Sequence, residues 1–340
     1  MRIAVTGGAG FIGSHTAAAL AEAGHYPIVI DDFRNSKPFI IDRLKTLCKG
    51  KLSFHEADCN DRDKMAGIFE KEQPEGIIHF AAYKAVGESV RHPLMYYRNN
   101  VGSLLTLLEL QKHYGIEHFV FSSSCTVYGV PDELPVTESS PVKKAQSPYG
   151  FTKQVGEQIL FDLQSASTPM RSVILRYFNP IGAHSSALIG ELPLGEPENL
   201  VPYITQTAAG IRKELTIFGQ DYETPDGTAI RDYIHVMDLA EAHVRAIAWL
   251  AESEEKASAE VFNLGAGRGS SVKEVVATFE EVSGVKLNYR YGPRRPGDVP
   301  AIYANADKAR KVLGWAVQRT LSDALRDAWH WQQQIHGLPV

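Results

Sequence analysis

Cysteines, long apolar runs and secretory features are scarce or missing in this sequence of 340 residues. Its three cysteines, Cys48, Cys59 and Cys125, form no C-x-x-C pair and no zinc-ligand spacing with histidine, so neither a disulfide framework nor a metal site is indicated. No apolar run approaches about eighteen residues, which argues against a membrane span. The first strand begins at Arg2 without a charged, apolar or cleavage region before it. We therefore expect a cytoplasmic protein with reduced thiols.

An excess of charge of one sign is also lacking. The formal net charge is −5 and the basic residues are dispersed, so no general attraction to nucleic acid or to anionic lipid is expected. The chain does have 44% hydrophobic residues over a length that exceeds the usual single core. This combination predicts one large domain and a smaller one.

A glycine-rich turn near the N-terminus is the first pattern that indicates a function. A short apolar strand at residues 3–5 leads into TGGAGFIGSH and an alanine-rich helix. The glycines fit both G-x-G-x-x-G and its G-x-x-G-x-x-G variant: Gly7, Gly8, Gly10 and Gly13. Such a turn brings backbone amides at a helix N-terminus onto a pyrophosphate. The predicted ligand is a dinucleotide.

Asp31 ends the second predicted strand and indicates which dinucleotide is bound. It lies eighteen residues after Gly13, where a carboxylate can bind the ribose diol. A carboxylate there repels a 2′-phosphate, so NAD is favoured over NADP, although Arg34 and Lys37 nearby keep NADP open. The structural alternative is a tight packing turn with Asp31 as a helix cap.

Apolar strands alternate with helices through the first half of the chain, which predicts a Rossmann-type, doubly wound parallel sheet. The later strands are expected at residues 27–30, 52–55, 76–80, 118–122 and 171–177. Residues 1–177 should form the NAD-binding domain, and residues 178–340, rich in Pro and Gly, a smaller α/β substrate domain from which some segments could return to the first. Ligands bind at the carboxyl ends of such strands, where Asp58, Phe80, residues 122–124 and Asn179 fall.

Tyr149 and Lys153 lie four residues apart in SPYGFTK, so one helical face would carry both side chains. An ammonium close to the phenol would lower the pKa of Tyr149 from its usual value of about 10. Tyr149 could then exchange a proton with a substrate hydroxyl. Taken alone, this spacing also fits a solvated helix face; the glycine turn favours the catalytic interpretation.

The helix after Asn99 carries leucines on more than one face: Leu104, Leu105, Leu107, Leu108 and Leu110. It therefore needs cover on two sides, from the sheet plus either a neighbouring helix or another subunit. We expect a homodimer with a helical contact.

Seven segments resemble the UDP-glucose 4-epimerase family of extended short-chain dehydrogenases/reductases. They are TGGAGFIGSH, HFAAYKAVGES, FSSSCTVYG, SPYGFTK, LRYFNPIGAH, RDYIHVMDLA and RRPGDV, and together they span nearly the whole chain in the family's order. The resemblance implies a catalytic triad of Ser124, Tyr149 and Lys153. It implies NAD contacts at Phe11, Ile12, Asp31, Asp58, Phe80, Lys84, Asn99 and Phe178, besides Tyr149, Lys153 and the turn glycines. It implies substrate contacts at Ser124, Asn179, Asn199, Leu200, Phe218, Arg231, Tyr233, Arg295 and Asp298.

The resemblance implies a reversible C4 epimerisation of a UDP-hexose, UDP-glucose to UDP-galactose, through a 4-keto sugar and transient NADH. Ile302 corresponds to the family's gate beside the hexose, and its intermediate size keeps N-acetylhexosamine substrates open. UDP-pentose substrates also stay open. A nucleotide-sugar 4,6-dehydratase would carry an Asp-Glu pair where this chain has Cys125 and Thr126. A non-catalytic NAD-binding regulator usually loses the residue equivalent to Tyr149 or Lys153.

Several residues also fit purely structural roles. Arg231 and Asp232 could form a surface ion pair, Asn179-Pro180 a turn, and His79 a satisfied strand residue. The second glycine turn, residues 265–269, fits a loop before a helix. Ser271 and Glu274 match a capping box at the start of that helix.

Overall fold

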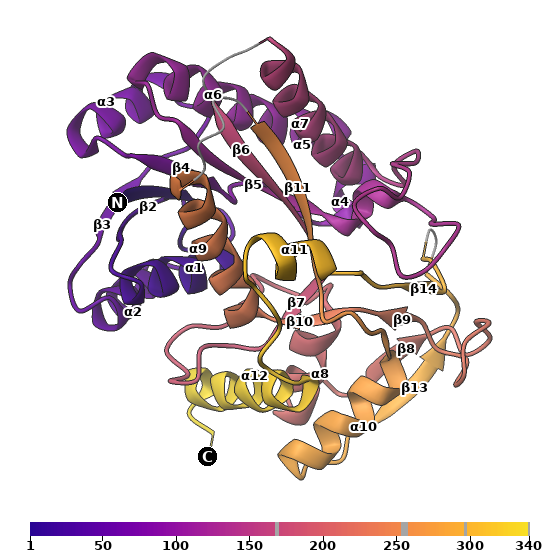
Figure 1. The fold of residues 1–340 in the computed structure, drawn as a ribbon. Helices are drawn as coiled ribbons and strands as arrows, with labels where there is room; N and C mark the ends of the chain where they lie inside the picture. Colours follow the sequence, from indigo (N-terminus) through magenta and orange to yellow (C-terminus); the bar gives the residue numbers. More distant parts are fainter. Residues whose placement is uncertain (167–169, 253–257, 296–297, 339–340) are drawn as a thin grey trace.

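A parallel β-sheet forms the centre of the computed structural model, which describes residues 1–166, 170–252, 258–295 and 298–338 (Figure 1). Its seven strands are β1 (Arg2–Thr6), β2 (Tyr26–Asp31), β3 (Ser53–Glu56), β4 (Gly76–His79), β5 (His118–Ser124), β6 (Arg171–Tyr177) and β11 (Ser258–Leu264). They follow the order β11-β6-β5-β4-β1-β2-β3, and each neighbouring pair is parallel. The predicted Rossmann-type sheet is confirmed.

Helices cover both faces of this sheet. The helices and helical turns of this part of the molecule are α1 (Phe11–Glu22), α2 (Phe39–Leu47), α3 (Arg62–Glu72), α4 (Val86–Arg91), α5 (Pro93–Tyr96), the π-helical η1 (Tyr97–Val101), α6 (Gly102–Tyr114), the 3₁₀ turn η2 (Cys125–Tyr128), α7 (Pro148–Ser165) and α9 (Val236–Glu252). Helices α1 and α9 pack together on one face, and α3, α6 and α7 cover the other (Figure 1). Because both faces are covered, the central strands are apolar on both sides, and every residue of β6 is buried.

Three segments from the second half of the chain join this layer. Strand β11 pairs with β6 along its whole length, from Ser258 opposite Arg171 to Leu264 opposite Tyr177. Helix α9 packs against α1, β5 and β6, and α11 (Asp307–Val312) packs against β11. The edge of the sheet beside α7 is therefore built from residues beyond 177.

The other elements form a smaller α/β unit, at the bottom of Figure 1. They are β7 (Asn179–Ile181), α8 (Leu200–Ala208), β8 (Leu215–Phe218), β9 (Ile230–Arg231), β10 (Tyr233–His235), β12 (Ser270–Ser271), α10 (Val272–Ser283), β13 (Tyr289–Gly292), β14 (Ala301–Ile302) and α12 (Leu321–His336). Helices α8, α10 and α12 share one apolar cluster with β8. The short strands pair as β10-β7, β13-β8 and β12-β9-β14, which joins distant loops around the carboxyl end of the large sheet.

Two local expectations are corrected by the structure. Asn179 and Pro180 do not form a turn, because they lie in β7, in register with Tyr233 and Ile234 of β10. The capping box at α10 is only half formed. The Ser271 hydroxyl accepts from the Glu274 amide at 3.0 Å, but the Glu274 carboxylate pairs with Arg268, 2.9 Å away.

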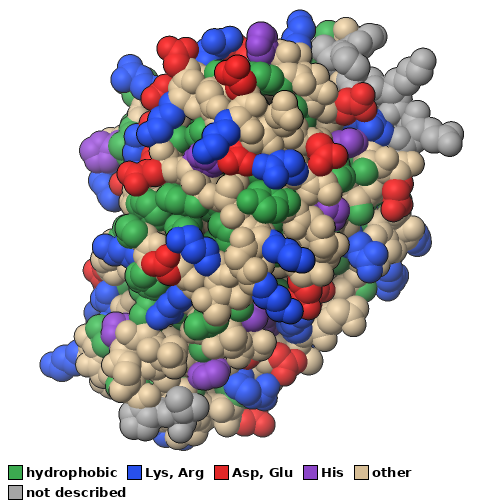
Figure 2. Space-filling view, turned by 90° about the vertical axis from the view of Figure 1, so that its left-hand side faces the viewer, with side chains coloured by type: hydrophobic (Ala, Val, Ile, Leu, Met, Phe, Trp, Pro, Cys, Tyr) green, Lys and Arg blue, Asp and Glu red, His purple; other side chains and the backbone are tan. Residues whose placement is uncertain are grey.

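Charges of both signs are intermixed on the face that Figure 2 shows, in agreement with the dispersed basic residues of the sequence. Hydrophobic side chains there form small separate groups between the charged ones. Among the described residues, no helix is both long and apolar enough to cross a membrane.

Candidate functional site

The glycine turn joins β1 to α1 and is shaped by close backbone contacts. Gly7 has a φ of +69°, and a Cβ there would lie 2.8 Å from the Ala81 amide nitrogen. A Cβ on Gly13 would lie 2.2 Å from the Gly7 carbonyl oxygen. Gly10 is the N-cap of α1 and makes no side-chain cap, so the amides of the first turn can face an anion. The turn fits a dinucleotide pyrophosphate.

Asp31 holds the turn from the end of β2. Its carboxylate accepts hydrogen bonds from the Ala9 amide at 3.0 Å, the Phe33 amide at 2.9 Å and the Ser36 hydroxyl at 2.8 Å. Burial raises the pKa of Asp31, and these three bonds act against the rise. Asp31 is thus no helix cap. Ser36 carries no sequence motif, and this role was not predicted for it.

Arg34 is held by the carboxylates beside Asp31. Its guanidinium lies 2.9 Å from Asp32 and 2.6 Å from Asp58. Although burial acts in the opposite direction, hydrogen bonds from Asn60 and Arg34 lower the pKa of Asp58. Arg34 is therefore already paired, which favours NAD over NADP at this end of the site.

Ser124, Tyr149 and Lys153 come together at the carboxyl end of β5. Ser124 ends that strand, and its hydroxyl accepts a hydrogen bond from the Thr126 amide at 3.3 Å. Tyr149 and Lys153 lie in the first two turns of α7, which begins after the N-cap Ser147. The Lys153 Nζ atom is 5.9 Å from the centre of the Tyr149 ring.

The expected effect of Lys153 on Tyr149 is not seen in the protein by itself. The Lys153 ammonium donates to the Ser122 carbonyl at 2.6 Å and lies over the Phe121 ring. Burial raises the pKa of Tyr149, Tyr177 adds to the rise, and a hydrogen bond with Ser124 acts against it. The prediction that Lys153 lowers this pKa is therefore wrong for the chain alone, because desolvation outweighs a cation that is bound elsewhere.

A buried ion pair fixes α7, the helix that carries Tyr149 and Lys153, to the sheet. Glu157 of α7 accepts from Arg176 of β6 at 2.6 Å, and each side chain is only 4% exposed. Glu157 also accepts from the Ser123 hydroxyl at 2.5 Å. Arg176 donates to the Tyr128 hydroxyl at 3.1 Å, which in turn donates to Asn263 of β11 at 2.6 Å. Sequence reasoning missed this network.

The residues matched to UDP form two contacting pairs in the smaller unit. Arg231 of β9 pairs with Asp298, and the Arg295 guanidinium lies over the Phe218 ring, 4.3 Å from its centre. Guanidinium groups such as these can bind a pyrophosphate by charge-assisted hydrogen bonds. Pro296 and Gly297 of the RRPGDV segment lie outside the described residues.

Asp232 is a buried hydrogen-bond acceptor and not half of a surface ion pair. Its carboxylate accepts from the amides of Ala266 at 2.6 Å, Gly267 at 3.3 Å and Ala304 at 3.1 Å. Its carbonyl oxygen accepts from the Asn179 amide at 2.9 Å. The second glycine turn thus supplies donors that hold the strand between Arg231 and Tyr233 in place.

Ile302 of β14 is 6% exposed and packs in an apolar cluster with Val127, Phe178 and Ala304. Cys125, next to Ser124, lies against the same cluster. His79 is a satisfied strand residue, because its Nδ1 atom lies 2.8 Å from the Thr6 hydroxyl.

The other predicted residues lie on loops and at the ends of helices and strands, around the carboxyl ends of the sheet strands. Phe11 and Ile12 begin α1, Phe80 and Lys84 follow β4, and Asn99 lies in η1. Phe178 lies between β6 and β7, Asn199 is the N-cap of α8, and Leu200 is its first residue.

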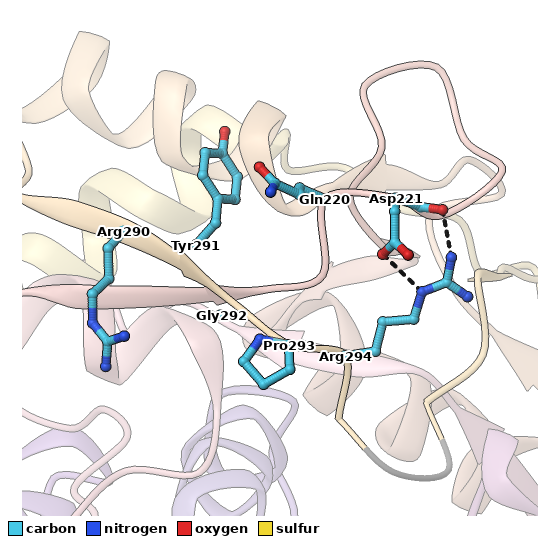
Figure 3. A pocket seen from close by; sticks show the side chains of 7 residues that line it. All are labelled: Gln220, Asp221, Arg290, Tyr291, Gly292, Pro293 and Arg294. Atoms are coloured by element: carbon cyan, nitrogen blue, oxygen red, sulfur yellow. Dashed lines mark hydrogen bonds and ion pairs between the residues drawn. The ribbon is translucent and has the colours of Figure 1, made fainter.

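An open pocket of about 590 Å³ lies beside Phe218 and Arg295, two of the residues matched to UDP (Figure 3). It is lined by Gln220, Asp221, Arg290, Tyr291, Gly292, Pro293 and Arg294. Arg294 reaches across it to Asp221, while Arg290 extends away from that pair. The pocket contains none of the predicted catalytic residues, Ser124, Tyr149 and Lys153. Among the described residues, no cluster of three His, Cys, Asp or Glu could hold a metal ion.

Burial lowers the pKa of Lys153 to about 8, whereas a lysine in an unfolded chain has a pKa of about 10.4. Between these values the unfolded chain holds a proton that the folded chain lacks, so this residue makes the free energy of unfolding rise with pH from about 8 to 10. Lys153→Met should abolish that rise and increase the free energy of unfolding at pH 7 by roughly 1–3 kcal/mol.

Urea denaturation of NAD-stripped protein at several pH values measures this effect. The exposed Lys112→Met in α6 is the matched control and should leave the pH dependence unchanged. A lower stability of Lys153→Met at pH 7, with the pH dependence retained, would contradict the prediction.

Comparison with known proteins gives one consistent family. A family model described as GDP-mannose 4,6 dehydratase matches residues 4–328. UDP-glucose 4-epimerase from Bacillus subtilis is 48% identical over 332 residues, covering 98% of this chain and 97% of that protein. UDP-glucose 4-epimerase 2 from Arabidopsis thaliana is also 48% identical, covering 97% of this chain and 94% of that protein.

Solved structures agree with the sequence relatives. A UDP-glucose 4-epimerase from Bifidobacterium longum, in complex with NAD⁺ and UDP, has a TM-score of 0.94 and 44% identity, covering 98% of both chains. The enzyme from Stenotrophomonas maltophila, with bound NAD and formylated UDP-arabinopyranose, has a TM-score of 0.96 and 44% identity, covering 99% of both. The chain therefore belongs, within the broader GDP-mannose 4,6 dehydratase family, to the UDP-glucose 4-epimerases.

Proposed function

We propose that the protein interconverts UDP-glucose and UDP-galactose by reversible oxidation at C4, with NAD as a resident cofactor. The observation that carries this proposal is the placement of Ser124, Tyr149 and Lys153 at the carboxyl end of β5, in the sheet that also carries the glycine turn. Epimerases 44% to 48% identical over nearly the whole chain support it, two of them solved with bound NAD.

Tyr149 exchanges the proton of the sugar C4 hydroxyl, and Ser124 holds that hydroxyl or relays its proton to the phenol. Lys153, fixed by the Ser122 carbonyl, keeps a cation beside Tyr149. When bound, NAD takes a hydride from C4 and returns it, and the positive charge of its nicotinamide ring favours the phenolate. The turn glycines with Phe11, Ile12, Asp31, Asp58, Phe80, Lys84, Asn99 and Phe178 would hold the dinucleotide.

Epimerisation requires that the keto sugar turn within the site, so the substrate must be held mainly at UDP. Arg231 and Arg295 supply the charge for the diphosphate, each already held by a neighbour: Arg231 by Asp298 and Arg295 by the Phe218 ring. Binding energy is then concentrated on the part of the substrate that does not react. Asn179, Asn199, Leu200 and Tyr233 complete the proposed UDP contacts.

The structure argues against a 4,6-dehydratase reaction. Elimination of water needs an acid and a base just after Ser124, and the residues there are Cys125 and Thr126 in η2. Neither side chain can replace a carboxyl pair at neutral pH, and burial raises the pKa of Cys125. The intact Tyr149 and Lys153 likewise argue against a silent NAD-binding regulator.

The proposal predicts turnover of UDP-galactose without added NAD. Denaturing the purified protein should release NAD or NADH, because the cycle regenerates the cofactor. Nucleotide-free protein that is fully active without added NAD would rule out the redox mechanism.

Tyr149→Phe should lower kcat by about 10² to 10⁴ and leave UDP binding nearly unchanged, since it removes only the hydroxyl. Tyr289→Phe, on exposed β13, is the control. A loss of less than about threefold at Tyr149 would assign proton transfer to another group.

Ile302 sets the proposed limit on larger sugars. Its β-branched side chain is stiff and sits in a packed cluster, so any space beside it has a fixed shape. We propose efficient turnover of UDP-galactose and weaker turnover of UDP-N-acetylgalactosamine.

Ile302→Tyr should selectively suppress turnover of the N-acetyl substrate, and Ile302→Ala should enhance it. Product analysis with UDP-galactose, UDP-N-acetylgalactosamine and UDP-xylose measures the ratios. Equal effects on all three substrates would show that Ile302 only fills the core.

A homodimer and a cytoplasmic location are also proposed. Large apolar side chains are exposed on four contacting helices: Val86 and Val90 of α4, Leu94 of α5, Leu105 of α6 and Phe151 of α7. The other leucines of α6 are buried within the chain itself, so Leu105 is the leucine of this helix whose apolar surface is left uncovered. Leu94→Glu should convert a dimer to monomers in light scattering, whereas Val312→Glu on α11 should not. A monomeric wild type would contradict the proposal.

The proposed cytoplasmic location rests on the cysteines. Their free thiols fit a reducing compartment.

A further inference from the structure

Glu191 contacts one residue that is matched to NAD and one that is matched to UDP. Its Oε1 atom accepts a hydrogen bond from the Asn199 side-chain amide at 2.6 Å and lies 3.4 Å from the Lys84 Nζ atom. Lys84 follows β4 and Asn199 precedes α8, 115 positions later in the chain. One carboxylate oxygen thus joins a residue matched to NAD with a residue matched to UDP.

The backbone of Glu191 is fixed from the C-terminal helix. Its carbonyl oxygen accepts from the Trp331 indole nitrogen at 2.9 Å, and Trp331 is 3% exposed. Gly190 lies flat against the indole, because a Cβ there would be 2.4 Å from the Trp331 Cγ atom. The side chain of Glu191 is itself 11% exposed. The carboxylate therefore has a fixed origin and few alternative positions.

The contact with Glu191 determines what the Asn199 side chain does. Asn199 is the N-cap of α8, where an asparagine commonly accepts a hydrogen bond from the first helical turn, yet it makes no such bond. Its amide is turned to Glu191 instead. The backbone amides of Leu200 and Val201, the first two residues of the nine-residue α8, then remain available for an anion such as a diphosphate, whereas Pro202 at the third position has no N–H.

Lys84 balances the charge of Glu191. A lone carboxylate beside a diphosphate site would repel the ligand, and the ammonium offsets that repulsion. Because 51% of the Lys84 side chain is exposed, solvent and salt screen this ion pair, so its main effect is on charge balance and not on folding stability.

We propose that Glu191 is a positioning residue for the UDP-sugar, which holds Asn199 in its ligand-binding orientation and leaves the N-terminus of α8 open to the diphosphate. The inference rests on the proposed function, since Asn199 and α8 are assigned to UDP there. Glu191 itself need not touch the substrate.

Glu191→Ala, Glu191→Gln and a matched Glu196→Ala test the proposal in the NAD-loaded protein. Glu196 lies in the same loop, pairs with Arg212 at 3.3 Å and is 71% exposed. Glu191→Ala should weaken UDP binding in calorimetry and raise the KM for UDP-galactose about tenfold, with kcat changed less than about threefold and NAD still copurifying. Glu191→Gln should be intermediate, because its amide oxygen still accepts from Asn199. Glu196→Ala should bind UDP like the wild type.

A double-mutant cycle with Asn199→Ala identifies the route. If Glu191 acts through Asn199, the double variant binds UDP no more weakly than Asn199→Ala alone. Additive losses, or UDP affinity of Glu191→Ala within twofold of the wild type, would overturn the proposal. If Glu191→Ala does not fold, the near-isosteric Glu191→Gln decides in the same way. A wild type that binds UDP but does not turn over UDP-galactose would instead count against the proposed function.

Discussion

The buried ion pair between Glu157 and Arg176 is the interaction on which the catalytic arrangement depends. Two charges removed from water are costly unless each finds further polar partners, and here Ser123 completes the shell of Glu157 and Tyr128 that of Arg176. The pair joins α7 to β6, and the Ser123 bond joins both to β5. Lys153 and Tyr149 lie about one and two turns earlier on the same helix, so their position relative to Ser124 follows from this contact.

Different interactions hold the cofactor side and the substrate side of the proposed site in place. On the cofactor side, a sheet buried on both faces fixes the ends of its strands. A Cβ added at Gly7 or Gly13 would lie within 3 Å of backbone atoms, so the turn allows little variation in sequence there. On the substrate side, short strand pairs and single hydrogen-bonded carboxylates, such as Asp232 and Glu191, join loops that are far apart in sequence. A rigid catalytic base beside a clamp built from loops suits a reaction that turns its substrate between two hydride transfers.

Local sequence patterns predicted the parts of the site that depend on neighbours along the chain. The glycine spacing determined the turn between β1 and α1, and the four-residue spacing of Tyr149 and Lys153 placed both on α7, because turns and helices are set by contacts within a few residues. Patterns failed where burial decided. The pKa of Tyr149 is raised and not lowered, and Asp232 binds backbone amides and not Arg231, because desolvation and the packing of distant segments have no local pattern.

The sequence by itself determined the parallel sheet, the dinucleotide turn and the choice of the proposed catalytic side chains. The alternation of apolar strands with helices and the resemblance of seven segments were sufficient for these. Only the tertiary structure decided that β11 returns beside β6, that Arg34 is paired with Asp58, and that Glu191 joins Lys84 to Asn199. Lys84 lies 107 positions before Glu191, and a contact between residues so far apart arises from the folded packing of the whole chain and not from any local preference.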